Sequence, residues 1–561
     1  MRCRRVWLCL SFVLVVAACA RPDTRTADAV VAASMCKAVP VAGTPTRLDD
    51  WSSGAKLLDD LGTFHRSATT RSPEAQRYFD QGMRLLWAFN HDEAARSFVR
   101  AGQLDPDCAT CWWGASLALG PNYNVGLMAD RAQAAWDALA RAKAASAKAS
   151  PVERALIDAL SRRSSGPEGL DAAAMQPFLE AYGSAMDQVA VRFPDDNDVR
   201  VMAAEALMTA HAWKLWTNDG QPTVATPRIV ALLETALIRD PKHPGANHYY
   251  IHTMEASLRP EAAVPSADRL GALMPGAGHL VHMPSHIYQR VGRYADSEAA
   301  NRAAEEADLA YLRVQKPQGY YPGYIAHNYD FEAFAALMRG RSTVAMTAQR
   351  RAVASDPGVD FYTAKPLLVA VRFGRWDTIL AEPMLDEKVP VGLALQRFAR
   401  AYAYAANGRL DHALAEARLL DAAIAAVPEG ATAGLNPSGP VLDVASKLVA
   451  ARIARRQGRA DEEIAMLRQA VTIEDGLAYD EPEDWLLPTR HVLGAALLAR
   501  GRAAEAEATY REDLRRRPEN GWALYGLAQA LKAEGRDASA VERRFANVWK
   551  DADTTITASA T

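Results

Sequence analysis

A recurring spacing of 34 residues is the feature that most restricts how this chain can fold. Gly501 and Gly535 are 34 residues apart, and the motifs that end at Pro241 and Pro275 have the same separation. Between these turn residues, apolar side chains recur at the three- and four-residue spacing of one helix face. A unit of this length suits two antiparallel helices, which cannot bury their apolar faces alone. The chain is therefore expected to stack successive helical hairpins.

The composition agrees with a helical chain. Alanine is frequent, glycine and proline fall mostly at segment ends, and 49% of the residues are hydrophobic with 23% charged. The strings FNHDEAARSF (from residue 89) and LGAALLARGRAAEAEATY (from residue 493) resemble the tetratricopeptide repeat. The resemblance implies an all-α, right-handed α-solenoid of tetratricopeptide-like helical hairpins.

The N-terminus has the pattern of an exported lipoprotein. Arg2, Arg4 and Arg5 precede an apolar run that is too short for a lasting membrane anchor, so residues 1–18 are predicted to be a signal peptide. The stretch that ends at Cys19 resembles the bacterial lipobox, which implies cleavage before Cys19 and its lipidation. The alternative is ordinary secretion with a free Cys19. Lipidation predicts a lipid anchor in the cell envelope, at the outer membrane and facing the periplasm.

A C-x-x-C pair, Cys108 and Cys111, follows the first repeat. Trp112 comes next in place of the histidine that covalent haem attachment requires. Two sulfurs are too few for a tetrahedral zinc site. In an oxidising compartment the pair is predicted either to form a local disulfide or to pack as two small side chains.

These patterns divide the chain into six segments. They are a lipoprotein signal peptide (1–18), a flexible tether and N-terminal lead-in (19–70), N-terminal hairpins with inserted loops (71–226), central hairpins with a histidine-rich groove (227–358), C-terminal hairpins (359–550) and a disordered tail (551–561). The net charge of −3 and the pI near 6.5 give no reason to expect a nucleic-acid partner.

Histidines recur at matched positions of two successive units. His248 and His252 lie seven and eleven residues after the proline that ends the preceding unit, and so do His282 and His286. Residues four apart share one face of a helix, provided that the second helix begins near Pro284 or kinks there. Both pairs are therefore expected to line the concave groove of the solenoid side by side.

Further side chains extend this row of histidines. Glu255 follows His252 by three residues, and His279 and His327 occupy matching registers in two units. The predicted metal ligands are therefore His248, His252, Glu255, His279, His282, His286 and His327. Imidazole and carboxylate groups suit a transition metal such as Zn, Cu, Fe or Mn. Glu255 is predicted either to bind the ion or to orient a histidine, and Glu205 in the preceding unit is a further candidate.

The segments HPGANHYYIHTMEAS (243–257) and PGAGHLVHMPSHIYQRVGRY (275–294) resemble a family of exported bacterial tetratricopeptide-repeat proteins of lipoprotein type. The resemblance implies the fold and export, and no particular activity. It also suggests that Asn90–His91 and Asn122–Tyr123–Asn124 belong to the same functional region.

Three functions are compatible with these patterns. The first is an envelope-anchored lipoprotein that binds a transition metal or a small polar ligand in its groove. The second is a scaffold that holds an envelope protein or peptide partner by hydrogen bonds from the histidines. The third is a metal-dependent enzyme that uses the same histidine and glutamate cluster. The chain has no H-E-x-x-H motif, so a protease of the zincin class is not indicated.

Overall fold

The computed structural model of the protein describes residues 45–316 and 320–560. Within these ranges the chain is almost entirely helical, with one short antiparallel pair of strands, β1 (Thr432–Ala433) and β2 (Asn436–Pro437). The predicted all-α class is therefore confirmed. The predicted signal peptide and Cys19 lie outside the described residues. No described helix is both long and apolar enough to cross a membrane.

Glycines at the hairpin turns explain the repeated spacing. Gly501 and Gly535 adopt φ angles of 72° and 71°, a left-handed backbone that glycine reaches without steric cost. Each ends one helix and lets the chain reverse into the next, as between α23 (Thr489–Ala499) and α24 (Ala503–Arg516). The two helices of such a pair pack against each other, so the predicted hairpins are confirmed.

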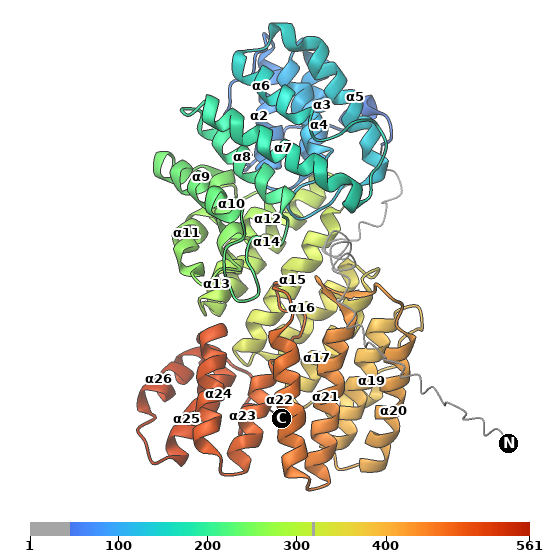
Figure 1. Ribbon diagram of the computed structural model, residues 1–561, viewed down its shortest axis with the longest axis vertical. Helices are drawn as coiled ribbons and strands as arrows, with labels where there is room; N and C mark the ends of the chain where they lie inside the picture. The colour runs from blue at the N-terminus through green and yellow to red at the C-terminus, as the bar shows by residue number, and fades with distance from the viewer. Residues whose placement is uncertain (1–44, 317–319, 561) are drawn as a thin grey trace, which may run out of the picture.

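The helices before residue 291 form the N-terminal arm, in the upper half of Figure 1. They are η1 (Leu48–Ser52), α2 (Pro73–Trp87), α3 (His91–Leu104), α4 (Ala109–Ala118), η2 (Ala129–Arg131), α5 (Ala132–Ala145), η3 (Ser146–Lys148), α6 (Pro151–Leu160), α7 (Ala172–Arg192), α8 (Asn197–Ala210), α9 (Thr226–Arg239), α10 (Pro244–Met254), η4 (Pro260–Ala263), α11 (Val264–Leu273), α12 (Gly278–His282) and α13 (Pro284–Arg290).

Two long helices, α14 (Tyr294–Val314) and α15 (Tyr321–Met338), join this arm to the C-terminal arm in the lower half of Figure 1. Besides α23 and α24, the C-terminal arm contains α16 (Ser342–Ser355), η5 (Asp360–Ala364), α17 (Lys365–Arg372), α18 (Trp376–Ala381), α19 (Pro390–Ala406), α20 (Leu410–Ala426), α21 (Ser438–Arg456), α22 (Ala460–Asp475), α25 (Gly521–Ala533) and α26 (Ser539–Val548).

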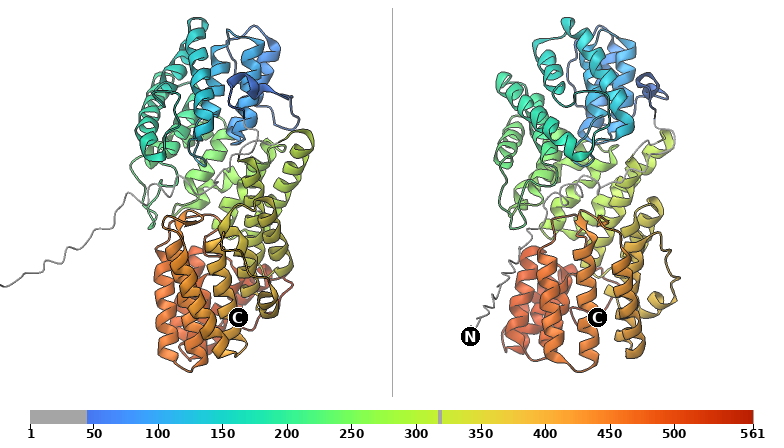
Figure 2. Two further views of the ribbon diagram at one scale, coloured as in Figure 1. Left: turned by 90° about the vertical axis from the view of Figure 1, so that its right-hand side faces the viewer. Right: turned by 45° about the vertical axis from the view of Figure 1, so that its right-hand side comes forward.

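Each arm has its own hydrophobic core, and the joining helices contribute to both. Helix α14 places Tyr311 in the core of the N-terminal arm and Tyr294 in that of the C-terminal arm. Helix α15 does the same with Tyr324 and Phe334. The two groups of helices remain distinct in the further views of Figure 2. The arms are therefore fixed to each other through shared helices rather than through a free linker.

The C-terminal arm closes on itself. Its last hairpin returns to the end of α15, where the indole Nε1 of Trp522 donates a hydrogen bond to the carbonyl oxygen of Leu337 at 2.8 Å. The ring of Trp549 packs over Gly340, at the turn between α15 and α16. An open solenoid contacts only neighbouring repeats, whereas here the last repeat also contacts the first of its arm.

The prediction of a disordered tail at 551–561 is wrong for the described residues up to 560. Asp553 accepts hydrogen bonds from the backbone amides of Ser342 and Thr343, at the N-terminus of α16. Farther on, the hydroxyl groups of Ser559 and Tyr510 lie 2.6 Å apart in a buried hydrogen bond. The small polar residues of this segment are therefore held by specific hydrogen bonds to the closed arm.

The packing of Tyr510 predicts an unusual response to a glycine substitution. The Tyr510 ring of α24 lies between Gly494 of α23 and Gly526 of α25, and a methyl group at either glycine would overlap it. Alanine is normally favoured over glycine inside a helix by about 1 kcal/mol. Overpacking costs about 1–3 kcal/mol, so Gly526→Ala is expected to lower the thermal unfolding midpoint measured by circular dichroism.

The matched control is Gly439→Ala, in helix α21. Nothing lies within 4 Å of the position that a Cβ would take there. This variant is expected to keep or slightly raise the unfolding midpoint. A midpoint for Gly526→Ala equal to that of Gly439→Ala would contradict the packing of Tyr510 between the two glycines.

Candidate metal centre

Six histidines converge where the two arms meet. They are His248 and His252 of α10, His279 and His282 of α12, His286 of α13 and His327 of α15. The first five are 0–3% exposed, and His327 is half-buried. The prediction of an open concave groove is thus corrected: the histidines are enclosed, because the arms close over them. The helix is interrupted at Met283, so the requirement that a helix begin near Pro284 is met.

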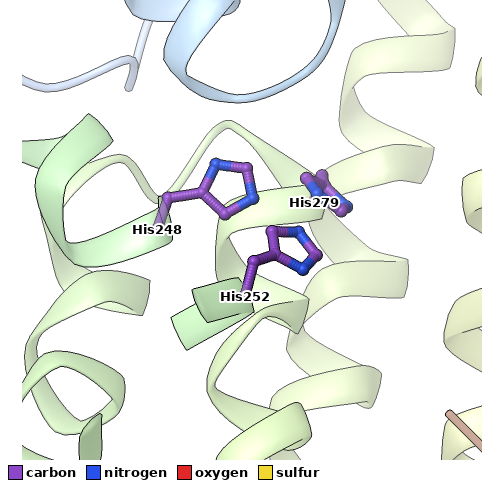
Figure 3. Close-up of side chains that lie close together, drawn as sticks. All are labelled: His248, His252 and His279. Atoms are coloured by element: carbon purple, nitrogen blue, oxygen red, sulfur yellow. The ribbon is translucent and has the colours of Figure 1, made fainter. Parts of the chain in front are cut away.

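One group of three, which we call the first triad, consists of His248, His252 and His279. One nitrogen of each ring lies within 4.8 Å of the others. Figure 3 shows the three rings around a common point, two from α10 and the third from α12. Three nitrogens gathered in this way could hold one metal ion.

Hydrogen bonds fix the orientation of two rings in the first triad. His248 Nδ1 lies 2.6 Å from the carbonyl oxygen of Trp87, to which it must donate its proton. His252 Nδ1 lies 3.2 Å from Glu255 Oε1. The Nε2 atoms of both rings, and both nitrogens of His279, have no hydrogen-bond partner among the described residues. The first triad therefore directs unpartnered lone pairs to one point.

The second triad consists of His282, His286 and His327, whose ligand atoms also lie within 4.8 Å of one another. His282 Nδ1 donates to Asn301 Oδ1 at 2.6 Å. The amide of Asn301 is oriented by its own bond to the carbonyl oxygen of Ser297, at 2.8 Å. His282 Nε2 faces His286 Nε2 at 2.9 Å. His282 and His286 thus form a hydrogen-bonded pair through their inner nitrogens, and the other nitrogen of each ring faces a partner outside the triad.

Two buried carboxylates lie beside the triads. Glu255, at the end of α10, has Oε1 near His252 and Oε2 at 2.9 Å from His286 Nδ1. Glu481 reaches in from the loop between α22 and α23, and its Oε2 lies 2.7 Å from the same His286 nitrogen. Glu481 is not among the predicted residues, because it is far from the histidines in the chain and outside the repeat register.

The electrostatics favour neutral imidazoles at most positions. Burial lowers the pKa of His248, His279 and His282 well below 6.5, because desolvation penalises the cation and neighbouring histidines add to the effect. His286 differs: burial lowers its pKa, but Glu255 and Glu481 outweigh burial and raise the pKa to about 9. Neutral rings keep the lone pair that a metal ligand needs.

Phe89 covers the first triad. Its ring centroid lies 4.5 Å from that of His248, 5.8 Å from His252 and 5.7 Å from His279. The backbone of Phe89 has φ 51°, and a left-handed conformation costs a residue with a side chain about 1–2 kcal/mol. Such strained residues concentrate at functional sites. The ring of Tyr324 also packs against His279, with 4.4 Å between the two ring centroids.

A cavity of about 830 Å³ lies beside the second triad and reaches Glu481. The loop around Asn218, the ends of α10 and α13, and the α22–α23 loop line it. Asn218 Nδ2 donates to the carbonyl oxygen of Gly476 at 3.3 Å, which links the two arms across this cavity. A ligand in the cavity could therefore approach the site through Glu481.

The remaining predicted residues fall into two groups. His91, Asn122 and Asn124 lie near the site: Asn122 contacts His91, and the Asn124 amide lies 3.4 Å from the Tyr324 hydroxyl. Glu205 accepts a hydrogen bond from Thr209 and lines a small pocket with His91, and it belongs to none of the candidate ligand groups among the described residues.

The two cysteines left open by the sequence are joined by a disulfide. Cys108 and Cys111 are bonded at the start of α4. Both residues are fully buried in the core of the N-terminal arm.

Comparisons with known proteins show distant similarity only. No protein-family model matches the chain, and no curated protein does. The solved structure of the human IFIT1 dimer with m7Gppp-AAAA is 12% identical, with 90% of this chain and 95% of that chain covered and a TM-score of 0.33. The TPR domain of P58(IPK) is 12% identical, with 82% of this chain and 98% of that chain covered and a TM-score of 0.21. Yeast Tom70 is 11% identical, with 84% of this chain and 90% of that chain covered and a TM-score of 0.29. Similarities at this level assign neither a ligand nor a partner.

The contact between Glu481 and His286 predicts a measurable titration. In protein stripped of metal with a chelator, His286 is expected to titrate near pH 9, followed by NMR of ¹³C-labelled histidine. Glu481→Gln removes one of the two charges that stabilise the imidazolium, so the pKa of His286 is expected to fall.

The control is Glu483→Gln, two residues along the same loop. Glu483 pairs with Arg517 and not with His286. This variant is expected to leave the His286 titration unchanged. An unchanged midpoint in Glu481→Gln would show that the loop of the C-terminal arm does not reach the histidines in solution.

Proposed function

We propose that this protein binds transition-metal ions through its buried histidine cluster. The observation that carries the proposal is the first triad, in which Nε2 of His248, Nε2 of His252 and a nitrogen of His279 face one another without partners among the described residues. The opposite nitrogens of His248 and His252 are held by Trp87 and Glu255. Histidines that ligate metals show this outer hydrogen bond almost always.

A metal-free polar site explains the same atoms less well. A buried polar atom left without a hydrogen bond costs about 1–3 kcal/mol, and four such nitrogens occur in the first triad alone. Phe89 and Tyr324 pack on these rings and leave a peptide no open groove to occupy. Metal coordination would satisfy the inward nitrogens together, which supports Zn, Cu, Fe or Mn over a hydrogen-bonded peptide.

The cavity favours a second candidate function, an interaction scaffold. Its walls come from both arms, and its carboxylates include Asp219 and Glu261, which are exposed. These groups favour a cationic segment of a protein partner. A stoichiometric partner that remains bound in the presence of a chelator and is lost on Glu261→Gln would support the scaffold over the metal site.

The location that we propose is the cell envelope, with a lipid anchor at Cys19. The support is the sequence of residues 1–19, an arginine-rich start and an apolar run before the cysteine. In a bacterial host the protein is expected to partition with membranes and to incorporate labelled palmitate. Cys19→Ser is expected to lose the label. Equal labelling of Cys19→Ser would contradict lipidation at this residue.

Metal content is the direct test of the function. Untagged protein is expected to copurify with a transition metal, or to bind one at micromolar concentration after chelator treatment, as measured by elemental analysis. The double variant His252→Ala/His286→Ala removes one histidine from each triad and is expected to lose that metal.

His412→Ala is the matched control, because His412 is exposed and outside all candidate ligand groups. It is expected to keep the full metal content. If the wild type binds no transition metal, or if the double variant binds as much as the His412 control, the proposed function is wrong.

A further inference from the structure

We infer that the histidine cluster is a two-ion centre, with one metal ion in each triad and Glu255 shared between them. The inference rests on the proposed metal-binding function and goes beyond it, since that function requires only one ion. It also distinguishes the two positions: the first triad is enclosed, whereas the second triad adjoins the cavity.

Distances exclude a single ion that uses all six histidines. A metal–nitrogen bond is about 2.0–2.1 Å, so two nitrogens on one ion lie no more than about 4.2 Å apart. Among the described residues, each candidate group whose ligand atoms lie within 4.8 Å of one another holds only three residues, and the two groups made of histidines alone have no residue in common. Each of these two groups supplies three ligands, the number that protein sites with an open coordination position commonly use.

A third grouping, His252, Glu255 and His286, takes one histidine from each triad. An ion placed there would displace the hydrogen bond between His252 Nδ1 and Glu255 Oε1, at 3.2 Å, although His286 Nδ1 and Glu255 Oε2, 2.9 Å apart, have no aligned hydrogen bond among the described residues. It would also leave the unpartnered nitrogens of His248 and His279 without a metal ion to bind. The third grouping is better explained as the connection between two ions than as a separate position.

Glu255 provides that connection through its two oxygens. Oε1 lies 3.2 Å from Nδ1 of His252 in the first triad, and Oε2 lies 2.9 Å from Nδ1 of His286 in the second. One carboxylate thereby orients a ligand of each ion and raises the basicity of both rings. Glu255 is therefore a positioning residue for both positions at once.

The two positions differ in access. Phe89 and Tyr324 pack against the first triad, and its three histidines are no more than 3% exposed. The second triad includes the half-buried His327, and its His286 contacts Glu481, which lines the cavity of about 830 Å³. An ion in the second triad is thus expected to be released to solvent or to a chelator before an ion in the first triad is released.

The lining of the cavity suits the passage of a cation toward the second triad. Eight carboxylate residues and four arginines line it, and the carboxylates outnumber the arginines although burial raises the pKa of Asp480, Glu481 and Asp484. The guanidinium groups of Arg515, Arg516 and Arg517 are each paired with carboxylates. An acidic cavity raises the local concentration of divalent cations.

The test is the stoichiometry of Zn²⁺ binding to chelator-treated full-length protein, measured by calorimetry and elemental analysis. The wild type and His412→Ala are expected to bind two equivalents. His248→Ala, in the first triad, and His327→Ala, in the second, are each expected to bind one. Glu255→Gln is expected to weaken both sites about 10- to 100-fold. Circular dichroism is used to check that each variant is folded.

A kinetic measurement adds a wild-type result that does not depend on any variant, and the two single variants then assign its phases. Zn²⁺ release to a colorimetric chelator is expected to be biphasic, with one equivalent fast and one slow. His327→Ala is expected to lose the fast phase, and His248→Ala the slow one.

The outcomes separate the inference from the function on which it rests. One equivalent in the wild type, lost in both single variants, would overturn the two-ion centre and leave the proposed metal binding standing. No bound Zn²⁺ or other transition metal in the wild type would overturn both. A single release phase that carries two equivalents would overturn the assigned difference in access.

Discussion

The burial of five imidazoles and two carboxylates at the junction of the arms, with a sixth imidazole half-buried beside them, is the constraint on which the rest of this structure depends. Polar groups removed from water destabilise a fold unless they are paired. Here the outer nitrogens are paired with a backbone carbonyl at Trp87, an amide at Asn301 and a carboxylate at Glu255. In the first triad the inner nitrogens have no hydrogen-bond partner among the described residues, whereas in the second triad His282 Nε2 and His286 Nε2 lie 2.9 Å apart as a hydrogen-bonded pair. A metal ion accepts several lone pairs at once, which is why the first triad carries the proposed metal binding.

The closure of the arms brings this set together. Trp87 and Phe89 come from the first hairpin of the N-terminal arm, yet they contact His248, about 160 residues later. Glu481 comes from the C-terminal arm and contacts His286, about 195 residues earlier. Helices α14 and α15, which share residues with both cores, hold the arms in the position where these contacts form. The strained backbone of Phe89 is stable only because this surrounding structure fixes it.

The parts of the molecule that repeat were the parts that the sequence could predict. Turn glycines such as Gly501 and the register of His248 and His282 depend on local helix geometry, which leaves a period in the sequence. Glu481 leaves no such signal, because its position depends on the closure of an arm and its neighbours in the loop are also acidic. The enclosed site and the ordered tail were missed for the same reason: Phe89 and Asp553 act through contacts that are distant in the chain.

The repeat also explains why there are two triads rather than one. His252 and His286 occupy the same position in consecutive units, eleven residues after the preceding proline. Stacking two units places equivalent side chains next to each other, and here both present Nδ1 to the same carboxylate, Glu255. The units are not identical around this pair, since Phe89 covers one triad and Glu481 with its cavity adjoins the other. A duplicated histidine pair thus acquires two different environments, which is the physical reason why the two proposed metal positions are expected to differ in access.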